Sequence, residues 1–354
     1  MYTHDDFIKI IKYAKEANAT DIHVAAGAVP AMRIEGRLSY MPFDMVLPKD
    51  TEALISDILD QERKNVLKST HYISLPIALH DIGRLRVNIF MQRGSYSINI
   101  KLLDRLLKTP EELGIPDAVI NLHRQESGLI LVCGNKNSGK STTVASLVKK
   151  ISTSRECHII TIEDPIEYLY KHDKAIVNQK EVGMDVNSFK EGVYSALTQD
   201  PDVIMISSAT DPATFSAALA AAENGHLVIT TLQTDDSIST IEYIVGMYPA
   251  DKSNYIKIQL SNALLAIVSQ CLIPAADGNG SKLAVEVMLA NQAIKNLIVE
   301  NKIHQIPAMI KASKSLGMIT MEDSINDLYT AGKITKQSAL NYMANRKSYF
   351  GGAR

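Results

Sequence analysis

Residues 128–150 read GLILVCGNKNSGKSTTVASLVKK, and this stretch predicts the fold of the region around it. The apolar run 129–133 is typical of a buried parallel strand, and residues 144–148 begin a helix. Between them, residues 134–141 match the pattern G-x-x-x-x-G-K-[ST] in full. In this pattern the glycines let backbone N–H groups turn toward a phosphate, and the start of the helix adds the positive end of its dipole. The combination of strand, loop and helix therefore predicts a binding site for a nucleoside triphosphate.

The residues of this phosphate loop have separate expected roles. Lys140 is expected to reach the β- and γ-phosphates, and the Ser141 hydroxyl to ligate Mg²⁺. Asn137 stands where a further glycine would fit easily, but asparagine is one of the few other residues that tolerate a left-handed backbone. ATP and Mg²⁺ are thus the expected cofactors. The other predicted nucleotide-binding residues are Gly134, Asn135, Lys136, Ser138, Gly139 and Thr142.

The composition is that of an ordinary globular protein with room for two domains. The chain has 354 residues, of which 46% are hydrophobic and 21% charged, and its formal net charge is −2. A net charge so close to zero gives no indication of binding to nucleic acid or to an anionic membrane. The N-terminus resembles an amphipathic helix and not a signal peptide, and no apolar run approaches the roughly 20 residues that span a bilayer.

The three cysteines suggest neither a metal site nor a disulfide framework. Cys133, Cys157 and Cys271 are scattered along the chain without a C-x-x-C pair. Together with the absence of a signal peptide, this pattern predicts a cytoplasmic protein with no transmembrane segment and no nucleic-acid partner.

Residues 1–103 are predicted to form a small α+β domain. The expected elements are a helix with an apolar stripe at Phe7, Ile10, Ile11 and Ala14, strands near 21–24 and 32–38, a helix near 52–68, and alternating strands at 83–90 and 96–102. Arg84 and Arg86 alternate along one of these strands and therefore share one face of it. Such arginines are usually solvated, but this pair would also suit a phosphate clamp.

Residues 126–345 are predicted to form the nucleotide-binding domain. Apolar runs at 157–162, 203–206 and 227–232 alternate with helical segments, which predicts a mostly parallel sheet with helices on both faces. Prolines and charged residues mark 104–125 as a linker and lead-in helix. The part after residue 261 is predicted to be rich in helices, and 346–354 to be a flexible tail.

Further polar residues follow the predicted strands of this domain. Glu163 ends one of them as the first of three carboxylates in five residues, which could hold Mg²⁺ or orient a water, although a solvated turn explains the same cluster equally well. The run 200–206 has the form of a Walker B strand, but Ser207 and Ser208 stand where an ATPase should have a carboxylate. His226 precedes another strand, and a lone histidine is more often structural than catalytic.

Taken together and in order, these residues resemble the PilT family of type IV pilus retraction motors, within the superfamily of type II/IV secretion ATPases. The resemblance covers nearly the whole chain. Besides the phosphate loop, the motifs that carry it are 19–23 (ATDIH), 83–88 (GRLRVN), 161–167 (TIEDPIE), 222–228 (AENGHLV), 269–270 (SQ), 293–298 (AIKNLI) and 316–321 (LGMITM).

The resemblance implies a PAS-like N-terminal domain, a RecA-like ATPase domain and a ring-shaped homohexamer with nucleotide bound between the two domains. It implies catalytic roles for Glu163, His226, Arg84 and Arg86, with Ser141 and Glu163 as metal ligands. It also implies twitching motility as the process, a location at the inner face of the cytoplasmic membrane, and an inner-membrane pilus platform protein as partner.

The chain departs from the family pattern at the chemistry, where Walker B and the histidine box are degenerate. The family usually has Gly-Glu-Met-Arg-Asp after the Walker B strand, and here the glutamate is Ser208, although Asp211 survives. The second histidine of the histidine box is Gln233. Family arginines are replaced at Lys101, Tyr194, Thr198 and Lys295.

These departures leave two functions open. The first is an ATP-binding subunit of a retraction motor with slow residual hydrolysis, supported by Glu163 and by His226 as its polar neighbour. The alternative is a non-hydrolysing regulatory or structural subunit that joins an active paralogue, in mixed hexamers or otherwise. An assembly ATPase of the same superfamily is disfavoured, since those proteins generally have a larger N-terminal region and a four-cysteine metal site.

Overall fold

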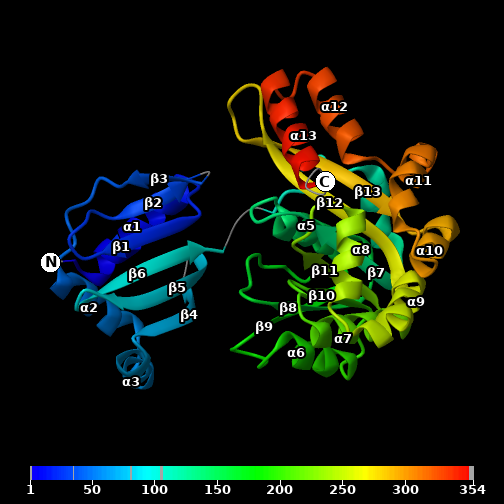
Figure 1. The fold of residues 1–354 in the computed structure, drawn as a ribbon. Coiled ribbons are helices and arrows are strands. Elements are labelled where there is room, and N and C mark those ends of the chain that lie inside the picture. Colours follow the sequence, from blue (N-terminus) through cyan, green and yellow to red (C-terminus); the bar gives the residue numbers. More distant parts are fainter. Residues whose placement is uncertain (1, 35, 80–81, 104–106, 351–354) are drawn as a thin grey trace. The chain divides into compact units, whose positions relative to one another are not determined.

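The computed structural model describes residues 2–34, 36–79, 82–103 and 107–350. The chain forms two compact units, Met1–Leu106 and Leu107–Arg354, each with its own sheet and core (Figure 1).

The first unit is built on an antiparallel sheet of six strands in the order β3-β2-β1-β6-β5-β4. The helices lie in sequence before β1 and between β3 and β4. The strands are β1 Asp21–Ala25, β2 Ala31–Ile34, β3 Arg37–Tyr40, β4 Tyr72–Leu79, β5 Gly83–Gln92 and β6 Ser95–Leu102. The helices are α1 His4–Glu16, α2 Pro48–Ile58 and α3 Gln61–Thr70.

Period-two alternation sets the two faces of this sheet. Along β5, Leu85, Val87 and Ile89 are buried in the core of the unit. Arg84 and Arg86 occupy the intervening positions and share the other face, which confirms that prediction.

One local prediction for this unit was wrong, and one strand was missed. The single helix expected near 52–68 is two helices, because Asp60 interrupts it and caps α3 by accepting a 2.8 Å hydrogen bond from the Arg63 amide. Strand β4 was not predicted at all. It contains Pro76, which lacks an N–H donor, and it is tolerated because β4 lies at the edge of the sheet.

The second unit is built on a sheet of seven strands in the order β13-β12-β7-β11-β10-β8-β9. All neighbours are parallel except β12 and β13, which form an antiparallel pair. The strands are β7 Gly128–Cys133, β8 His158–Glu163, β9 Ile176–Glu181, β10 Val203–Ile206, β11 Leu227–Leu232, β12 Leu264–Pro274 and β13 Ser281–Leu289.

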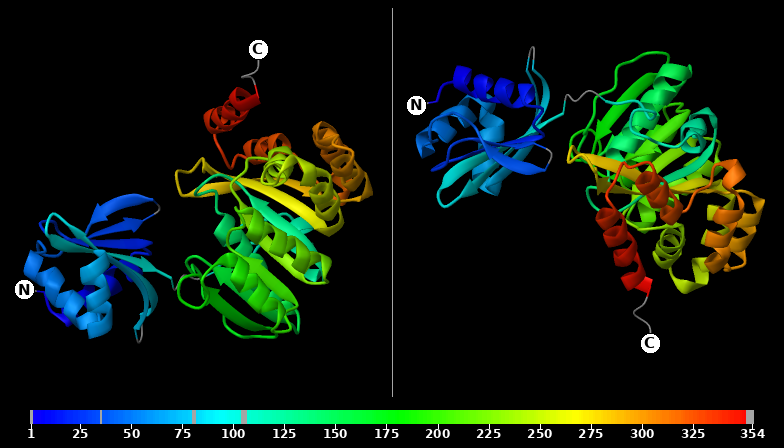
Figure 2. Two further views of the ribbon diagram at one scale, coloured as in Figure 1. Left: turned by 60° about the horizontal axis from the view of Figure 1, so that its bottom comes forward. Right: turned by 90° about the horizontal axis from the view of Figure 1, so that it is seen from above.

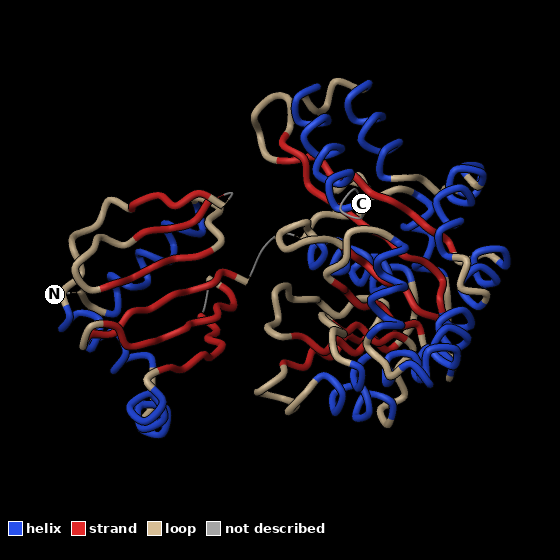
Figure 3. Tube along the Cα trace, viewed as in Figure 1, coloured by secondary structure: helices blue, strands red, loops and turns tan. Residues whose placement is uncertain are grey.

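Helices cover both faces of this sheet, as predicted (Figures 2 and 3). The α-helices are α4 Asp117–Ile120, α5 Lys140–Ser154, α6 Phe189–Leu197, α7 Pro212–Glu223, α8 Ser237–Gly246, α9 Ser253–Ala263, α10 Gln292–Val299, α11 Ile306–Ala312, α12 Met321–Thr330 and α13 Lys336–Phe350. Short 3₁₀ turns are η1 Asn121–Arg124, η2 Ala250–Lys252, η3 Ile303–Gln305 and η4 Lys314–Leu316.

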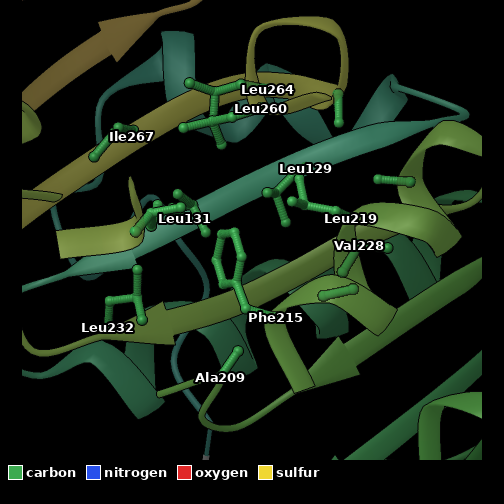
Figure 4. Packing of buried hydrophobic residues seen from close by; sticks show 14 of the residues in the cluster. Leu129, Leu131, Ala209, Phe215, Leu219, Val228, Leu232, Leu260, Leu264 and Ile267 are labelled. Carbon is green, nitrogen blue, oxygen red and sulfur yellow. The ribbon is translucent and has the colours of Figure 1, made fainter. Parts of the chain in front are cut away.

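The alternating side chains of β7 connect the two layers of core. Leu129 and Leu131 pack with α7 and α9, whereas Ile130 and Val132 pack with α5 on the opposite face. Phe215 of α7 is fully buried against the first of these faces (Figure 4). Because β7 is buried along its whole length, the loop that follows it starts from a fixed position.

The region after residue 261 begins with strands and not with helices, so this prediction was wrong for 264–289. Strands β12 and β13 form a hairpin over this range, and helices resume at α10. The sequence is misleading because 264–268 is a continuous apolar run, which is equally compatible with a buried helix. Strand β12 is buried on both faces because its side chains enter both layers of core: Leu264 and Ile267 pack in one layer, and Ala266 and Val268 in the other.

Other expected boundaries are partly described. Part of the predicted lead-in helix is present as α4 and η1, while residues 104–106 of the linker lie outside the described residues. Helix α13 extends through Phe350, into the predicted tail, and 351–354 are likewise outside the described residues. Within the described part of the chain, no helix combines the length and the apolar character that crossing a membrane requires.

Candidate nucleotide-binding site

The phosphate loop connects buried β7 to α5 through a tight, glycine-dependent turn. Gly134 has φ +148°, and a Cβ there would collide with Ser138 Oγ and the carbonyl oxygen of Gln270. Gly139, with φ +88°, immediately precedes α5. Asn137 has φ +65°, so the prediction that asparagine adopts a left-handed backbone here is confirmed. The loop is thus folded as a cradle in which only glycine fits at its first position.

Gln270 supports the cradle from the neighbouring strand β12. Its Nε2 donates a 2.7 Å hydrogen bond to the carbonyl oxygen of Ser138, and both side chains are buried. This contact joins residues 132 positions apart in sequence. Sequence reasoning used Gln270 only as part of a family motif and did not anticipate this structural role.

Lys140 lies across the mouth of the loop. Its Nζ donates to the carbonyl oxygens of Gly134, at 2.6 Å, and Asn135, at 2.8 Å. Partial burial lowers the pKa of the Lys140 ammonium from its ordinary value. A cation held by the loop at the positive end of α5 fits the binding of a phosphate chain.

Glu163 is the most perturbed carboxyl of the second unit. It ends β8 with a side chain that is only 4% exposed. Its Oε1 accepts hydrogen bonds from Thr161 Oγ1, at 2.7 Å, and from Gln179 Nε2, at 3.0 Å. Burial raises the pKa of Glu163 to about 7, and these two hydrogen bonds offset part of the effect.

A cavity of about 100 Å³ brings several predicted residues together. Ser141, Glu163 and Ser208 line it, from the start of α5 and the carboxyl ends of β8 and β10. Glu167 and Thr231 line it as well. Hydroxyl and carboxylate oxygens are the ligands that Mg²⁺ prefers, so Ser141 and Glu163 fit the metal role assigned to them.

The segment after the Walker B strand has a structural role in addition to its position at the cavity. The carbonyl oxygen of Ser207 accepts a 2.7 Å hydrogen bond from Thr231 Oγ1 of β11. Asp211, the surviving acidic residue, caps α7 by accepting from the amides of Ala213 and Thr214. Although burial opposes the shift, the hydrogen bonds lower the pKa of Asp211, which keeps this cap charged.

His226 lies at the other end of the sheet, so the expectation that it neighbours Glu163 was wrong. The strand register places His226 level with His158, at the amino ends of β11 and β8. Glu163 is five residues further along β8, or about 16 Å at 3.3 Å per residue. The Nδ1 atom of His226 forms a 2.7 Å hydrogen bond with the carbonyl oxygen of Pro201. A catalytic role for His226 therefore has no support from the geometry of one chain.

Arg84 and Arg86 belong to the first unit and are half-buried in β5. Arg86 Nε donates a 2.9 Å hydrogen bond to Ser74 Oγ of the neighbouring strand. Their approach to a phosphate remains a prediction.

Four further contacts at the site escaped sequence reasoning. Gln179 donates both to Glu163 and to the carbonyl oxygen of Tyr168, which ties the edge strand β9 to the acidic loop. The Tyr168 hydroxyl lies 2.8 Å from Thr142 Oγ1 in the first turn of α5, directly after the phosphate loop. Asn135 Nδ2 donates a 2.6 Å hydrogen bond to Asp235 Oδ1, in the loop after β11. Recognition of the strand at 176–181 would have revealed the first contact, because Gln179 pairs with Thr161 in its register.

Comparison with known proteins assigns this architecture to a family. The type II/IV secretion system protein family matches residues 76–332. The chain belongs to this family. Among curated members, it is 33% identical to the type IV pilus ATPase PilU of Pseudomonas aeruginosa, over 95% of this chain and 88% of PilU. It is 34% identical to the pilus retraction ATPase PilT of the same species, over 94% of this chain and 97% of PilT.

Two solved structures agree with the fold. The pilus retraction motor PilT with bound ADP superimposes with a TM-score of 0.87 at 41% identity, covering 94% of this chain and 96% of that structure. The ATPase DotB of Legionella pneumophila shares the fold, with a TM-score of 0.82 at 22% identity, over 97% of this chain and 96% of DotB. The predicted membership of the PilT group is confirmed, and so is a PAS-like domain followed by a RecA-like P-loop ATPase domain.

Proposed function

We propose that this protein is the ATP-binding subunit of a hexameric, PilT-like retraction motor of type IV pili, with slow hydrolysis. The observation that carries the proposal is the phosphate loop, in which Lys140 lies over a cradle formed by Gly134 and Gln270. The likeness to PilT and PilU over nearly the whole chain supports the assignment to pilus retraction and twitching motility. A place in the cytoplasm, at the inner face of the membrane against a pilus platform protein, belongs to the same proposal.

Different residues of the site would bind the phosphates and the metal of Mg·ATP. Backbone N–H groups of the loop and the Lys140 ammonium would hold the phosphates, while Ser141 and Glu163 would hold the metal. The bound nucleotide and metal would supply the transferable phosphoryl group and a divalent charge. Thr142 would keep its hydrogen bond to Tyr168, so that the acidic loop stays against the phosphate loop.

Slow hydrolysis is proposed because the residues that line the cavity lack the usual Walker B carboxylate. Ser208 takes its place at the end of β10 and cannot act as a base at neutral pH. A positioned general base contributes roughly 10²–10⁴-fold to a rate. Glu163, at the end of β8, is a carboxylate of this cavity that can orient a water, so we expect weak turnover and not complete inactivity.

Hexamer formation is a further part of the proposal. In a ring, Arg84 and Arg86 of the first unit would approach phosphate across a domain or subunit boundary. Light scattering with ATP should then give a mass near six times 38.9 kDa. A strictly monomeric protein at high concentration with ATP would contradict the ring.

One observation favours a second candidate function. The run 207–210, Ser-Ser-Ala-Thr, follows β10 directly. An ATPase usually has at this position the carboxylate that supports hydrolysis. A subunit of this kind could bind ATP and act in a regulatory or structural way beside an active paralogue. Co-purification from cells that express both proteins would distinguish mixed from uniform hexamers.

The deciding experiment measures steady-state phosphate release by the purified protein and four variants. We expect wild-type turnover well below that of PilT measured in parallel. Lys140→Ala and Glu163→Gln should abolish it, and Ser208→Glu should raise it by restoring the carboxylate. His226→Gln should leave the rate of phosphate release unchanged, because His226 lies far from Glu163 of the same chain. Rapid wild-type turnover that Lys140→Ala eliminates would show that Ser208 is compatible with catalysis and would refute slow hydrolysis.

A further inference from the structure

A carboxylate that the proposed catalytic residues do not include lies against the phosphate loop. Asp235 follows β11 in sequence, and its Oδ1 accepts a 2.6 Å hydrogen bond from Nδ2 of Asn135, the second residue of the loop. Both side chains are exposed to solvent. The bond joins residues 100 positions apart, so the fold and not the local sequence creates it.

The backbone on the C-terminal side of Asp235 is held firmly by its own contacts. Asp236 caps α8 by accepting a 2.8 Å hydrogen bond from the Ser239 amide. The amide and the hydroxyl of Ser237 both donate to Glu286 Oε1 of β13, at 2.9 Å and 2.8 Å. Asp235 is therefore presented to the loop by a short segment anchored on a helix start and on the sheet.

Asp235 and Lys140 carry opposite charges, and both form a hydrogen bond with Asn135. Asn135 accepts a 2.8 Å hydrogen bond from Lys140 through its carbonyl oxygen, and it donates to Asp235 through its side chain. The ammonium attracts the phosphates of a nucleotide. A carboxylate beside the same loop repels them, because like charges raise each other's energy even in water.

We propose that Asp235 is a specificity-determining residue that weakens binding of metal-free nucleoside triphosphates and makes tight binding depend on a divalent cation. The inference rests on the proposed binding of ATP. Metal-free ATP carries one more negative charge than ADP, so the repulsion is larger for the triphosphate. A divalent cation on the phosphates cancels much of that charge and removes most of the penalty.

Isothermal calorimetry with ATP and with ADP, each in Mg²⁺ and in EDTA, tests the inference on the full chain. Asp235→Asn keeps the size of the side chain and an oxygen that can accept from Asn135, but it removes the charge. We expect it to bind metal-free ATP about two- to fivefold more tightly than wild type does, the range typical of one exposed charge pair. The gain should be smaller for ADP and less than about twofold for Mg·ATP.

Glu156→Gln is the matched control. It removes the same charge from an exposed carboxylate just before β8, at the amino edge of the sheet, whereas the phosphate loop lies at the carboxyl edge. Raising the salt to 1 M, where the Debye length falls to about 3 Å, should erase the effect of Asp235→Asn. Asp235→Ala should shift the affinity in the same direction as Asp235→Asn, and thermal melting would establish that all variants are folded.

The outcomes separate the two proposals. If wild type binds ATP and Asp235→Asn binds metal-free ATP no better than Glu156→Gln does, the role of Asp235 is overturned while the proposed function stands. A gain equal for ATP, ADP and Mg·ATP would also overturn it, since that result indicates a change in loop structure and not in charge. If wild type binds neither nucleotide under any condition, the proposed function fails first and this inference falls with it.

Discussion

Replacement of Glu163 by glutamine should stabilise the protein at neutral and alkaline pH and change little near pH 4.5. Burial raises the pKa of Glu163 from 4.5 to about 7, even though Thr161 and Gln179 donate hydrogen bonds to it. A carboxyl with a higher pKa in the folded chain than in the unfolded chain holds its proton more tightly when folded. The stability linked to that proton is complete below pH 4.5 and is lost as pH rises through 7.

The size of the effect follows from the same two values. Each unit by which a pKa changes corresponds to about 1.4 kcal/mol. The rise in the pKa of Glu163 from 4.5 to about 7 therefore corresponds to roughly 3 kcal/mol. Glutamine does not ionise, and its Oε1 can accept the same two hydrogen bonds. The variant therefore escapes the cost of burying a charge, while it keeps the packing and the polar contacts of β8.

Urea denaturation followed by far-UV circular dichroism between pH 4.5 and 8 measures this difference. Nucleotide is omitted and EDTA is present, so that no metal ion holds the carboxylate in its charged form. The free energy of unfolding of Glu163→Gln minus that of wild type should rise from near zero at pH 4.5 to about 3 kcal/mol at pH 8. Glu156→Gln, at an exposed carboxyl, should give a flat difference across the range.

A pH-independent difference between Glu163→Gln and wild type would refute the reasoning. It would mean that the carboxyl is hydrated in solution and titrates as it does in the unfolded chain. The reasoning would also be refuted if the wild type gained stability relative to Glu163→Gln as the pH rises. In that case the hydrogen bonds from Thr161 and Gln179 would outweigh burial.

Three other substitutions test the scaffold of the site. Gly134→Ala should weaken ATP binding at least tenfold in calorimetry and cost about 1–3 kcal/mol of stability, because its Cβ meets Ser138 and Gln270; unchanged affinity would mean that the loop relaxes. Asp211→Ala should lower the free energy of unfolding by about 0.5–2 kcal/mol through loss of the α7 cap, whereas Asp211→Asn should retain most of it. Phe215→Ala should cost about 3–5 kcal/mol in the same denaturation assay, since the ring is fully buried between α7 and β7; a cost below about 1 kcal/mol would indicate that the core collapses around the gap.

The parts of the site that could be predicted are those in which local sequence determines local backbone. The phosphate loop is such a part, since the glycines, Asn137 and Lys140 lie within seven consecutive residues and each has a conformational or chemical reason for its position. The shared face of Arg84 and Arg86 is another, because strand alternation alone determines it.

The contacts that could not be predicted join segments far apart in the chain. Gln179 reaches Glu163 only because β9 pairs with β8, and β9 was missed since its four consecutive polar residues, 178–181, resemble those of a loop. Gln270 reaches the phosphate loop only because β12 lies beside β7, where a helix was expected. The error for His226 has the same origin, since its distance from Glu163 depends on the register of three parallel strands.

Under the proposed function, binding and hydrolysis would depend on different parts of this site, and the departures proposed at Walker B lie in the second. Binding relies on the turn after β7, where Gly134 and Lys140 keep the required geometry and Gln270 supports it from β12. Hydrolysis would rely on side chains at the ends of neighbouring strands, where Ser208 lines the cavity and Glu163 is largely buried. The residue at 208 can change without disturbing the loop backbone, because Ser208 takes part in none of the hydrogen bonds given above for the described loop residues. Slow hydrolysis with tight nucleotide binding is therefore physically consistent in this chain, and Ser208→Glu is the substitution that should separate the two properties most directly.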